Sequence, residues 1–252
     1  MPYDSIVSIV LKRDIYHYFS GTGFFVHFPP KNDVFFITAR HCIIQKEENY
    51  NLNKPSEIKD TLYVFPRGSS SAIDFEFFIE TLDVDGSQYK EDILVGLVKN
   101  DSVENYDDLL KKSLRILHED DSNLLLENIS KINGNCRLIG YPSINKSIES
   151  NDDFSHNVIK AQVRGFYGKY KKIDGKKHLY EVYDSNWKEE SLSGFSGSPI
   201  IEFIPYINEQ GILDYEAVPL GILLTEKRFI SINIITEILS KYYFNLENQK
   251  QI

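Results

Sequence analysis

The sequence contains few cysteines and no long hydrophobic stretch. Only two of its 252 residues are cysteines, which excludes a small secreted scaffold held together by disulfides. No segment approaches the roughly 20 consecutive apolar residues that a membrane-spanning helix needs. The N-terminal segment also lacks the basic, apolar and small residues that form a secretory signal in that order. We therefore expect a cytoplasmic protein with no membrane partner.

Basic residues are also fewer than acidic ones. The chain has 28 Lys and Arg against 37 Asp and Glu, a formal net charge of −9, which argues against a surface that binds phosphates and hence against nucleic acid as a partner. With 42% hydrophobic and 26% charged residues, the chain has the composition of a folded globular protein. Its length suffices for one large domain or two small ones.

The apolar segments are short and rich in Phe, Tyr, Ile and Val, and Gly, Pro, Asn or Asp separate them. This pattern is typical of an all-β sandwich or barrel. Residues 106–117 and 234–243 are instead predicted to be helical, the first because leucines recur at helical spacing. The polar stretches 45–60 and 143–155 predict surface loops.

Two candidate functional residues lie at the ends of apolar strands in the first half of the chain. His41 follows the strand 34–38, where a histidine would be held on a rigid element as a general base, although most such histidines only pack or form hydrogen bonds. Asp92 opens the apolar strand 93–98. Near the core its carboxylate would need a partner, such as a histidine ring nitrogen, but it would equally serve as a solvated first residue of the strand.

Residues 194–199 (GFSGSP) precede another apolar strand. A nucleophilic serine needs its Oγ exposed on a tight turn beside backbone N–H groups that can bind an oxyanion. Glycines on both sides of Ser196 permit such a turn. In isolation, a hexamer of this kind is also common as a loop between strands.

Taken in order, these motifs give the sequence a resemblance to the trypsin-like (chymotrypsin-fold) serine peptidases of the bacterial, stand-alone type. The pattern Thr-Ala-x-His-Cys, the Asp before an apolar strand and Gly-x-Ser-Gly-x-Pro appear in the family's order and at similar separations. Residues 21–26 (GTGFFV) and 138–142 (LIGYP) resemble further strands of that fold. The α/β-hydrolase pattern is excluded, since it requires a histidine after the serine and none follows Ser196.

The resemblance implies an all-β fold: two antiparallel six-stranded β-barrels packed together, with a C-terminal α-helix. It places the N-terminal barrel at 1–105, a polar and partly helical connector at 106–131, the C-terminal barrel at 132–233, and a helix and tail at 234–252. Both cysteines are expected to be free thiols, because residues 21–28 offer no partner for Cys42, and Cys136 would lie in the other barrel.

The resemblance also implies a serine endopeptidase. Ser196 would be the nucleophile, His41 the base and Asp92 its orienting carboxylate, with the N–H groups of Gly194 and Ser196 as the oxyanion hole. No metal or other cofactor is expected, and the expected partner is a protein or peptide substrate. Two alternatives remain: an inactive trypsin-like module that binds a peptide or partner protein, and an acidic binding domain without catalysis.

Regulation and specificity follow less directly from the resemblance. The digestive enzymes of this family place an Asp before the nucleophile to receive a newly freed N-terminal ammonium, whereas this chain has Phe195. We therefore expect no zymogen activation, and either constitutive activity or control by a partner protein that orders the loop 186–195, for example in a bacterial system that defends against phage. Glu190 lies where the family's specificity pocket has its base, and Glu226 would line it. These carboxylates would favour substrate Arg or Lys, unless residues 188–190 are only a solvated loop.

Overall fold

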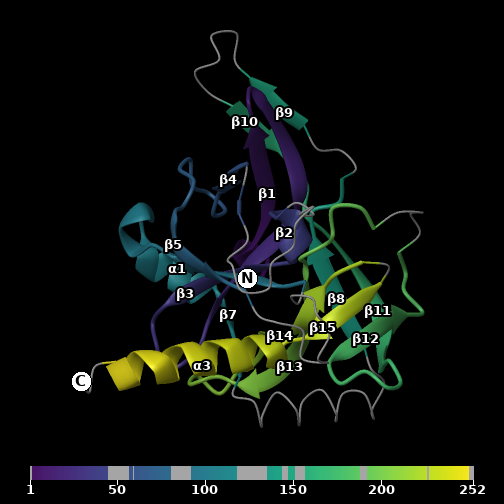
Figure 1. Ribbon diagram of the computed structural model, residues 1–252. Helices are drawn as coiled ribbons and strands as arrows, with labels where there is room; N and C mark the ends of the chain where they lie inside the picture. The colour runs from purple at the N-terminus through teal and green to yellow at the C-terminus, as the bar shows by residue number, and fades with distance from the viewer. Residues whose placement is uncertain are drawn as a thin grey trace.

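The computed structural model of the chain describes residues 2–44, 57–58, 60–80, 92–117, 135–143, 147–150, 157–187, 192–225 and 227–249. Strands dominate this described part, in two halves that follow each other along the chain, with a long helix at the C-terminal end (Figure 1). The expected all-β fold with a C-terminal helix is confirmed. The boundaries expected at residues 105, 131 and 233 stay predictions.

The first half forms one sheet in which six strands follow the order β4-β1-β2-β3-β6-β5, and a seventh strand, β7, pairs with β2 in parallel. Its elements are the 3-10 helix η1 (Pro2–Ser5), β1 (Ile6–Arg13), β2 (Tyr16–His27), β3 (Val34–Thr38), the 3-10 helix η2 (Arg40–Cys42), β4 (Thr61–Val64), β5 (Phe75–Ile79), β6 (Leu94–Val98), the 3-10 helix η3 (Asn100–Ser102), the helix α1 (Tyr106–Lys112) and β7 (Leu114–Arg115).

This first sheet differs from the closed six-stranded barrel that we expected. Among the described residues no hydrogen bonds join its edge strands β4 and β5, because β4 is only four residues long and pairs with β1 alone. The helix expected over 106–117 ends at Lys112, and the last part of that segment continues as β7.

The second half is a closed six-stranded barrel in the order β11-β12-β15-β14-β13-β8, as expected. Its elements are β8 (Asn135–Gly140), β9 (Ser147–Ser150), β10 (Asn157–Lys160), β11 (Arg164–Lys172), β12 (Leu179–Tyr183), β13 (Pro199–Ile207), β14 (Leu213–Leu223), β15 (Arg228–Ser231) and the C-terminal helix α3 (Asn233–Gln249). The segment 143–155 was expected to be a loop throughout, but β9 lies within it. Pairing with β10, which the polar composition did not indicate, makes it a strand.

Two strands, β3 and β6, run through the middle of the first sheet; every residue of both is buried, and all are apolar except Thr38 at the end of β3. Successive side chains of a strand point to opposite faces. Accordingly Phe35 and Ile37 pack into one hydrophobic cluster, and Val34 and Phe36 into another. Both faces of the sheet are thus covered, which explains why these strands lack the polar alternation of a strand with one solvated face.

The two halves share one of these clusters. It combines side chains of β2, β3 and β6 with side chains of β13, β14, β15 and α3, among them Ile201, Ile222, Ile230, Ile235 and Leu239. The helix α3 therefore packs against both halves and fixes one against the other (Figure 1). The ends of β3 and β6 and the turn before β13 carry the candidate catalytic residues of the two halves.

Candidate active site

His41 and Asp92 lie side by side because β3 and β6 pair antiparallel. Thr38 at the end of β3 is in register with Leu94 at the start of β6, so the residues just after β3 meet those just before β6. The carboxylate of Asp92 accepts two hydrogen bonds from His41, one from the backbone N–H to Oδ1 at 2.9 Å and one at Nδ1 to Oδ2 at 2.6 Å. The Asp92 carbonyl also accepts the backbone N–H of Arg40 at 3.2 Å. Of the two sequence interpretations, the structure supports the paired carboxylate.

The contact with Asp92 affects the proton affinity of His41. Burial lowers the pKa of the ring, but hydrogen bonds with Asp92 and Cys42, and the electrostatic attraction of both, raise it by more. The pKa of His41 therefore lies above its ordinary value of 6.5. Since the hydrogen bond to the carboxylate occupies Nδ1, the other ring nitrogen, Nε2, is the one left to exchange protons with a substrate or nucleophile. The ring side chain is 42% exposed, so reactants can reach it.

Ser196 stands on a tight turn that two glycines make possible. Gly194 has φ +88° and Gly197 has φ +84°, a left-handed backbone that residues with a Cβ rarely adopt. A Cβ at Gly197 would also lie 2.1 Å from a backbone carbonyl oxygen of β2. Ser196 is half-buried, whereas Ser198 is fully buried, so only Ser196 is open to an incoming molecule.

The Ser196 hydroxyl donates a hydrogen bond of 2.8 Å to the carbonyl oxygen of Leu224. The described residues contain no hydrogen bond between Ser196 and His41. The two chain segments nevertheless meet, because Sγ of Cys42, the residue after His41, donates to the carbonyl oxygen of Ser196 at 3.5 Å. The structure thus places Ser196 beside the His41–Asp92 pair, with its hydroxyl turned toward Leu224.

Two N–H groups of the backbone around Ser196 have no acceptor in the described structure. Within the described part of the chain, neither the N–H of Gly194 nor that of Ser196 donates to a protein group. The peptide before Gly194 is fixed, because the carbonyl oxygen of Ser193 accepts the N–H of Ser143 at 2.8 Å. Two unpaired N–H groups flanking a serine on a fixed turn are what an oxyanion hole requires.

Phe195 anchors this turn by packing its side chain into the core. Its side chain is fully buried and makes edge contacts with two rings, Phe166 at 5.5 Å and Trp187 at 5.0 Å between centroids. An apolar aromatic cluster therefore occupies the place where the sequence resemblance would put a buried carboxylate and its ammonium partner.

The remaining expectations divide into a confirmed one and an untested one. Cys42 and Cys136 are both free and buried, as expected. Glu190 and Glu226, the residues expected to determine specificity, lie outside the described residues. The described part of the loop 186–195 consists of residues 186–187 and 192–195.

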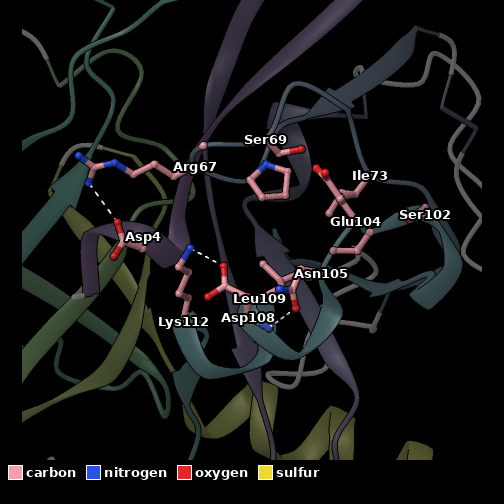
Figure 2. Close-up of a pocket in the computed structure, with 13 residues that line it drawn as sticks. Asp4, Arg67, Ser69, Ile73, Ser102, Glu104, Asn105, Asp108, Leu109 and Lys112 are labelled. Atoms are coloured by element: carbon pink, nitrogen blue, oxygen red, sulfur yellow. Dashed lines mark hydrogen bonds and ion pairs between the residues drawn. The ribbon is translucent and has the colours of Figure 1, made fainter.

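A cavity of about 520 Å³ that the sequence did not indicate lies in the first half, between η1, the β4–β5 connection and α1 (Figure 2). None of the candidate catalytic residues lines it. Its charged side chains largely pair with one another, Arg67 with Asp4 at 3.3 Å and Lys112 with Asp108 at 2.5 Å, and nothing in the sequence pattern had marked it.

The described residues contain no group of three or more His, Cys, Asp and Glu side chains arranged to hold a metal ion. None of the helices they form has the length and apolar character needed to cross a membrane.

Comparisons with solved structures show that the chain has the chymotrypsin fold of the trypsin-like serine proteases. It is similar to a thermostable serine protease, AL20, from an extremophilic microorganism, with 9% sequence identity over 90% of each chain and a TM-score of 0.51. It is also similar to the Drosophila Grass clip serine protease of the Toll pathway, with 10% identity over 94% of this chain and 67% of that one, and a TM-score of 0.51. No protein-family model and no curated protein matches the sequence.

Proposed function

We propose that the protein is a serine endopeptidase that uses His41, Asp92 and Ser196 as its catalytic triad. The observation that carries the proposal is the pairing of His41 with Asp92 through both the ring and the backbone. Near this pair lies a serine turn on which two N–H groups have no acceptor among the described residues. The chymotrypsin fold supports it, and the histidine lies in the first half of the molecule and the serine in the second.

In the proposed reaction, Ser196 Oγ bonds to the carbonyl carbon of the scissile peptide while His41 Nε2 takes its proton. The N–H groups of Gly194 and Ser196 stabilise the oxyanion, each by roughly 3 kcal/mol in enzymes of this mechanism. The carbon–nitrogen bond then breaks, and the leaving amine receives the proton from His41. Water hydrolyses the acyl-enzyme by the same steps, and Asp92 stabilises the imidazolium in both halves of the reaction.

The experiment is labelling with a fluorophosphonate probe, which phosphonylates an activated serine. We expect labelling of the unmodified chain, its loss in Ser196→Ala and its retention in Ser198→Ala. Ser198 is the matched control because it lies two residues away but is fully buried. Labelling that persists in Ser196→Ala would refute the assignment of the nucleophile.

One observation favours the second candidate, an inactive module that binds a peptide or partner protein. The Ser196 hydroxyl is bonded to the Leu224 carbonyl and not to His41. Rotation of the Ser196 side chain would redirect it, so an active enzyme must leave this bond during each turnover. If the chain binds peptides but the probe labels no residue, the second candidate holds.

Two finer features belong to the proposal. The fixed Ser193–Gly194 peptide and the buried Phe195 support constitutive activity over control by a partner protein that orders the loop. Comparable activity with and without candidate partner proteins, such as neighbours in a defence system against phage, would confirm constitutive activity.

Glu190 and Glu226 would direct cleavage after Arg or Lys, and peptide libraries cleaved only after apolar residues would refute this preference.

A further inference from the structure

Thr22 is a buried threonine of β2 that forms three hydrogen bonds with the second half of the molecule, two of them with the turn carrying Ser196. Its side-chain hydroxyl accepts the N–H of Tyr141 at 2.9 Å and donates to the carbonyl oxygen of Gly194 at 2.8 Å. Its backbone N–H donates to the carbonyl oxygen of Ser196 at 2.9 Å. Thr22 itself is 0% exposed, whereas its partners Tyr141, Gly194 and Ser196 are partly buried.

The glycine before Thr22 allows this approach. A Cβ on Gly21 would lie 3.0 Å from the carbonyl oxygen of Ser196 and 2.4 Å from Cys42 Sγ. The strand backbone can therefore come close to the serine turn because Gly21 has no side chain. The sequence Gly-Thr-Gly thus presents one hydroxyl between two segments that belong to the other half of the molecule.

Thr22 holds peptides that adjoin the proposed oxyanion N–H groups. The carbonyl of Gly194 belongs to the peptide between Gly194 and Phe195, which lies between the two peptides that carry the N–H groups of Gly194 and Ser196. The N–H of Phe195 donates to the carbonyl oxygen of Leu192 at 3.0 Å, so the Thr22 hydroxyl is the second anchor of this peptide. Without that anchor the peptide could tilt, since glycine tolerates many backbone conformations, and a tilt would change the direction of the N–H groups on both sides.

We propose that Thr22 is a positioning residue for catalysis. Its hydroxyl accepts a hydrogen bond from the Tyr141 N–H, donates one to the Gly194 carbonyl, and so keeps the oxyanion-binding turn in place. This inference rests on the proposed function. Thr22 acts from the first half of the molecule on a turn of the second, at a site where Phe195 offers no ion pair for the same task. A hydroxyl suits this place because it accepts and donates at once.

The test removes the hydroxyl and then restores it. Thr22→Val keeps the shape but neither donates nor accepts, Thr22→Ala removes the hydroxyl without adding bulk, and Thr22→Ser keeps the hydroxyl. Thr236→Val is the matched control, because Thr236 is also a buried threonine whose hydroxyl bonds to a backbone carbonyl, but it lies on α3. The rate of fluorophosphonate labelling and, separately, kcat and KM for p-nitrophenyl acetate are measured, with thermal unfolding as the check on folding.

We expect Thr22→Val and Thr22→Ala to fold and to lower kcat by about 10- to 100-fold, somewhat less than the loss of a whole oxyanion donor. KM should stay within about threefold, because the turn acts on the transition state more than on the bound substrate. Thr22→Ser should restore kcat to within about threefold of the unmodified chain, and Thr236→Val should leave it unchanged.

The inference is overturned if the folded hydroxyl-free variants keep the original kcat, if Thr22→Ser is as slow as Thr22→Val, or if the loss lies in KM. It is also overturned if both hydroxyl-free variants fail to fold while Thr22→Ser folds, because Thr22 would then serve stability only. Failure of the proposed function looks different: the unmodified chain itself would show no labelling that depends on Ser196.

Discussion

Phe195→Ala tests whether an aromatic cluster stabilises the serine turn. The Phe195 ring is 0% exposed and meets the Phe166 ring at an interplanar angle of 85° and the Trp187 ring at 82°. Truncation to Ala removes both edge contacts and opens a cavity behind Ser196. Since Phe195 is the residue at which this chain departs most clearly from the digestive enzymes it resembles, the size of the effect measures how much the replacement contributes.

The expected loss in the free energy of unfolding follows from these contacts. Truncation of a fully buried Phe to Ala costs about 3–5 kcal/mol. Phe195→Leu fills most of the space but loses the ring geometry, and each edge-to-face pair is worth about 0.5–1.5 kcal/mol, so two pairs predict a loss of about 1–3 kcal/mol. Phe244→Ala, at a residue that is 65% exposed on α3, is the control and should change stability by less than about 0.5 kcal/mol.

The assay is urea denaturation followed by tryptophan fluorescence. Trp187 is the only tryptophan of the chain, and its contact with Phe195 makes it a local reporter of this cluster. A loss below about 1 kcal/mol for Phe195→Ala, with an unchanged slope against urea, would refute the account of the turn, as would equal losses for Phe195→Ala and Phe244→Ala.

Three further predictions concern the site. Because a general base must be neutral and the pKa of His41 is raised, kcat/KM should rise with pH, with a midpoint above pH 6.5. Asp92→Asn should lower this midpoint and reduce kcat by about 10⁴-fold. A midpoint at or below pH 6.5 in the unmodified chain would contradict the pairing of His41 with Asp92. Gly197→Ala should lower the free energy of unfolding, measured with heat or urea, by about 3 kcal/mol or more, since it adds a clash with a backbone oxygen to the strain of a left-handed backbone. The control Gly211→Ala, with φ +75° but open space around it, should lower it by about 1–2 kcal/mol. Equal losses would contradict the close packing of the turn. Ser198→Ala should leave the free energy of unfolding unchanged or raise it by up to about 1 kcal/mol, because the Ser198 hydroxyl has no hydrogen-bond partner among the described residues. A loss above about 1 kcal/mol would show that the hydroxyl has a partner.

Much of the fold and the site could be predicted because each signal was local. The largely apolar strand before His41 and the apolar strand after Asp92 predicted two buried strands. Their antiparallel pairing brings the two residues together. Glycines around Ser196 predicted the turn that the structure contains. The order of the three motifs along the chain then indicated one fold and excluded another.

The rest depends on contacts between segments that are distant in the sequence. Nothing in residues 113–117 marked a strand, because β7 exists only through its pairing with β2. Thr22 looked like an ordinary strand residue, and its role became visible only when the fold brought Tyr141 and Gly194 to its hydroxyl. The orientation of the Ser196 hydroxyl toward Leu224 is likewise a side-chain conformation, on which a sequence pattern carries no information.

The central claim is that Ser196 is an activated nucleophile, and peptide mapping of the labelled chain tests it most directly. The full-length protein is treated with a fluorophosphonate at a pH high enough for His41 to be neutral, then digested, and the modified residue is identified by mass spectrometry. We predict a single adduct, on Ser196, that is absent from His41→Ala. An adduct on another residue, or none at any pH at which the chain stays folded, would contradict the account.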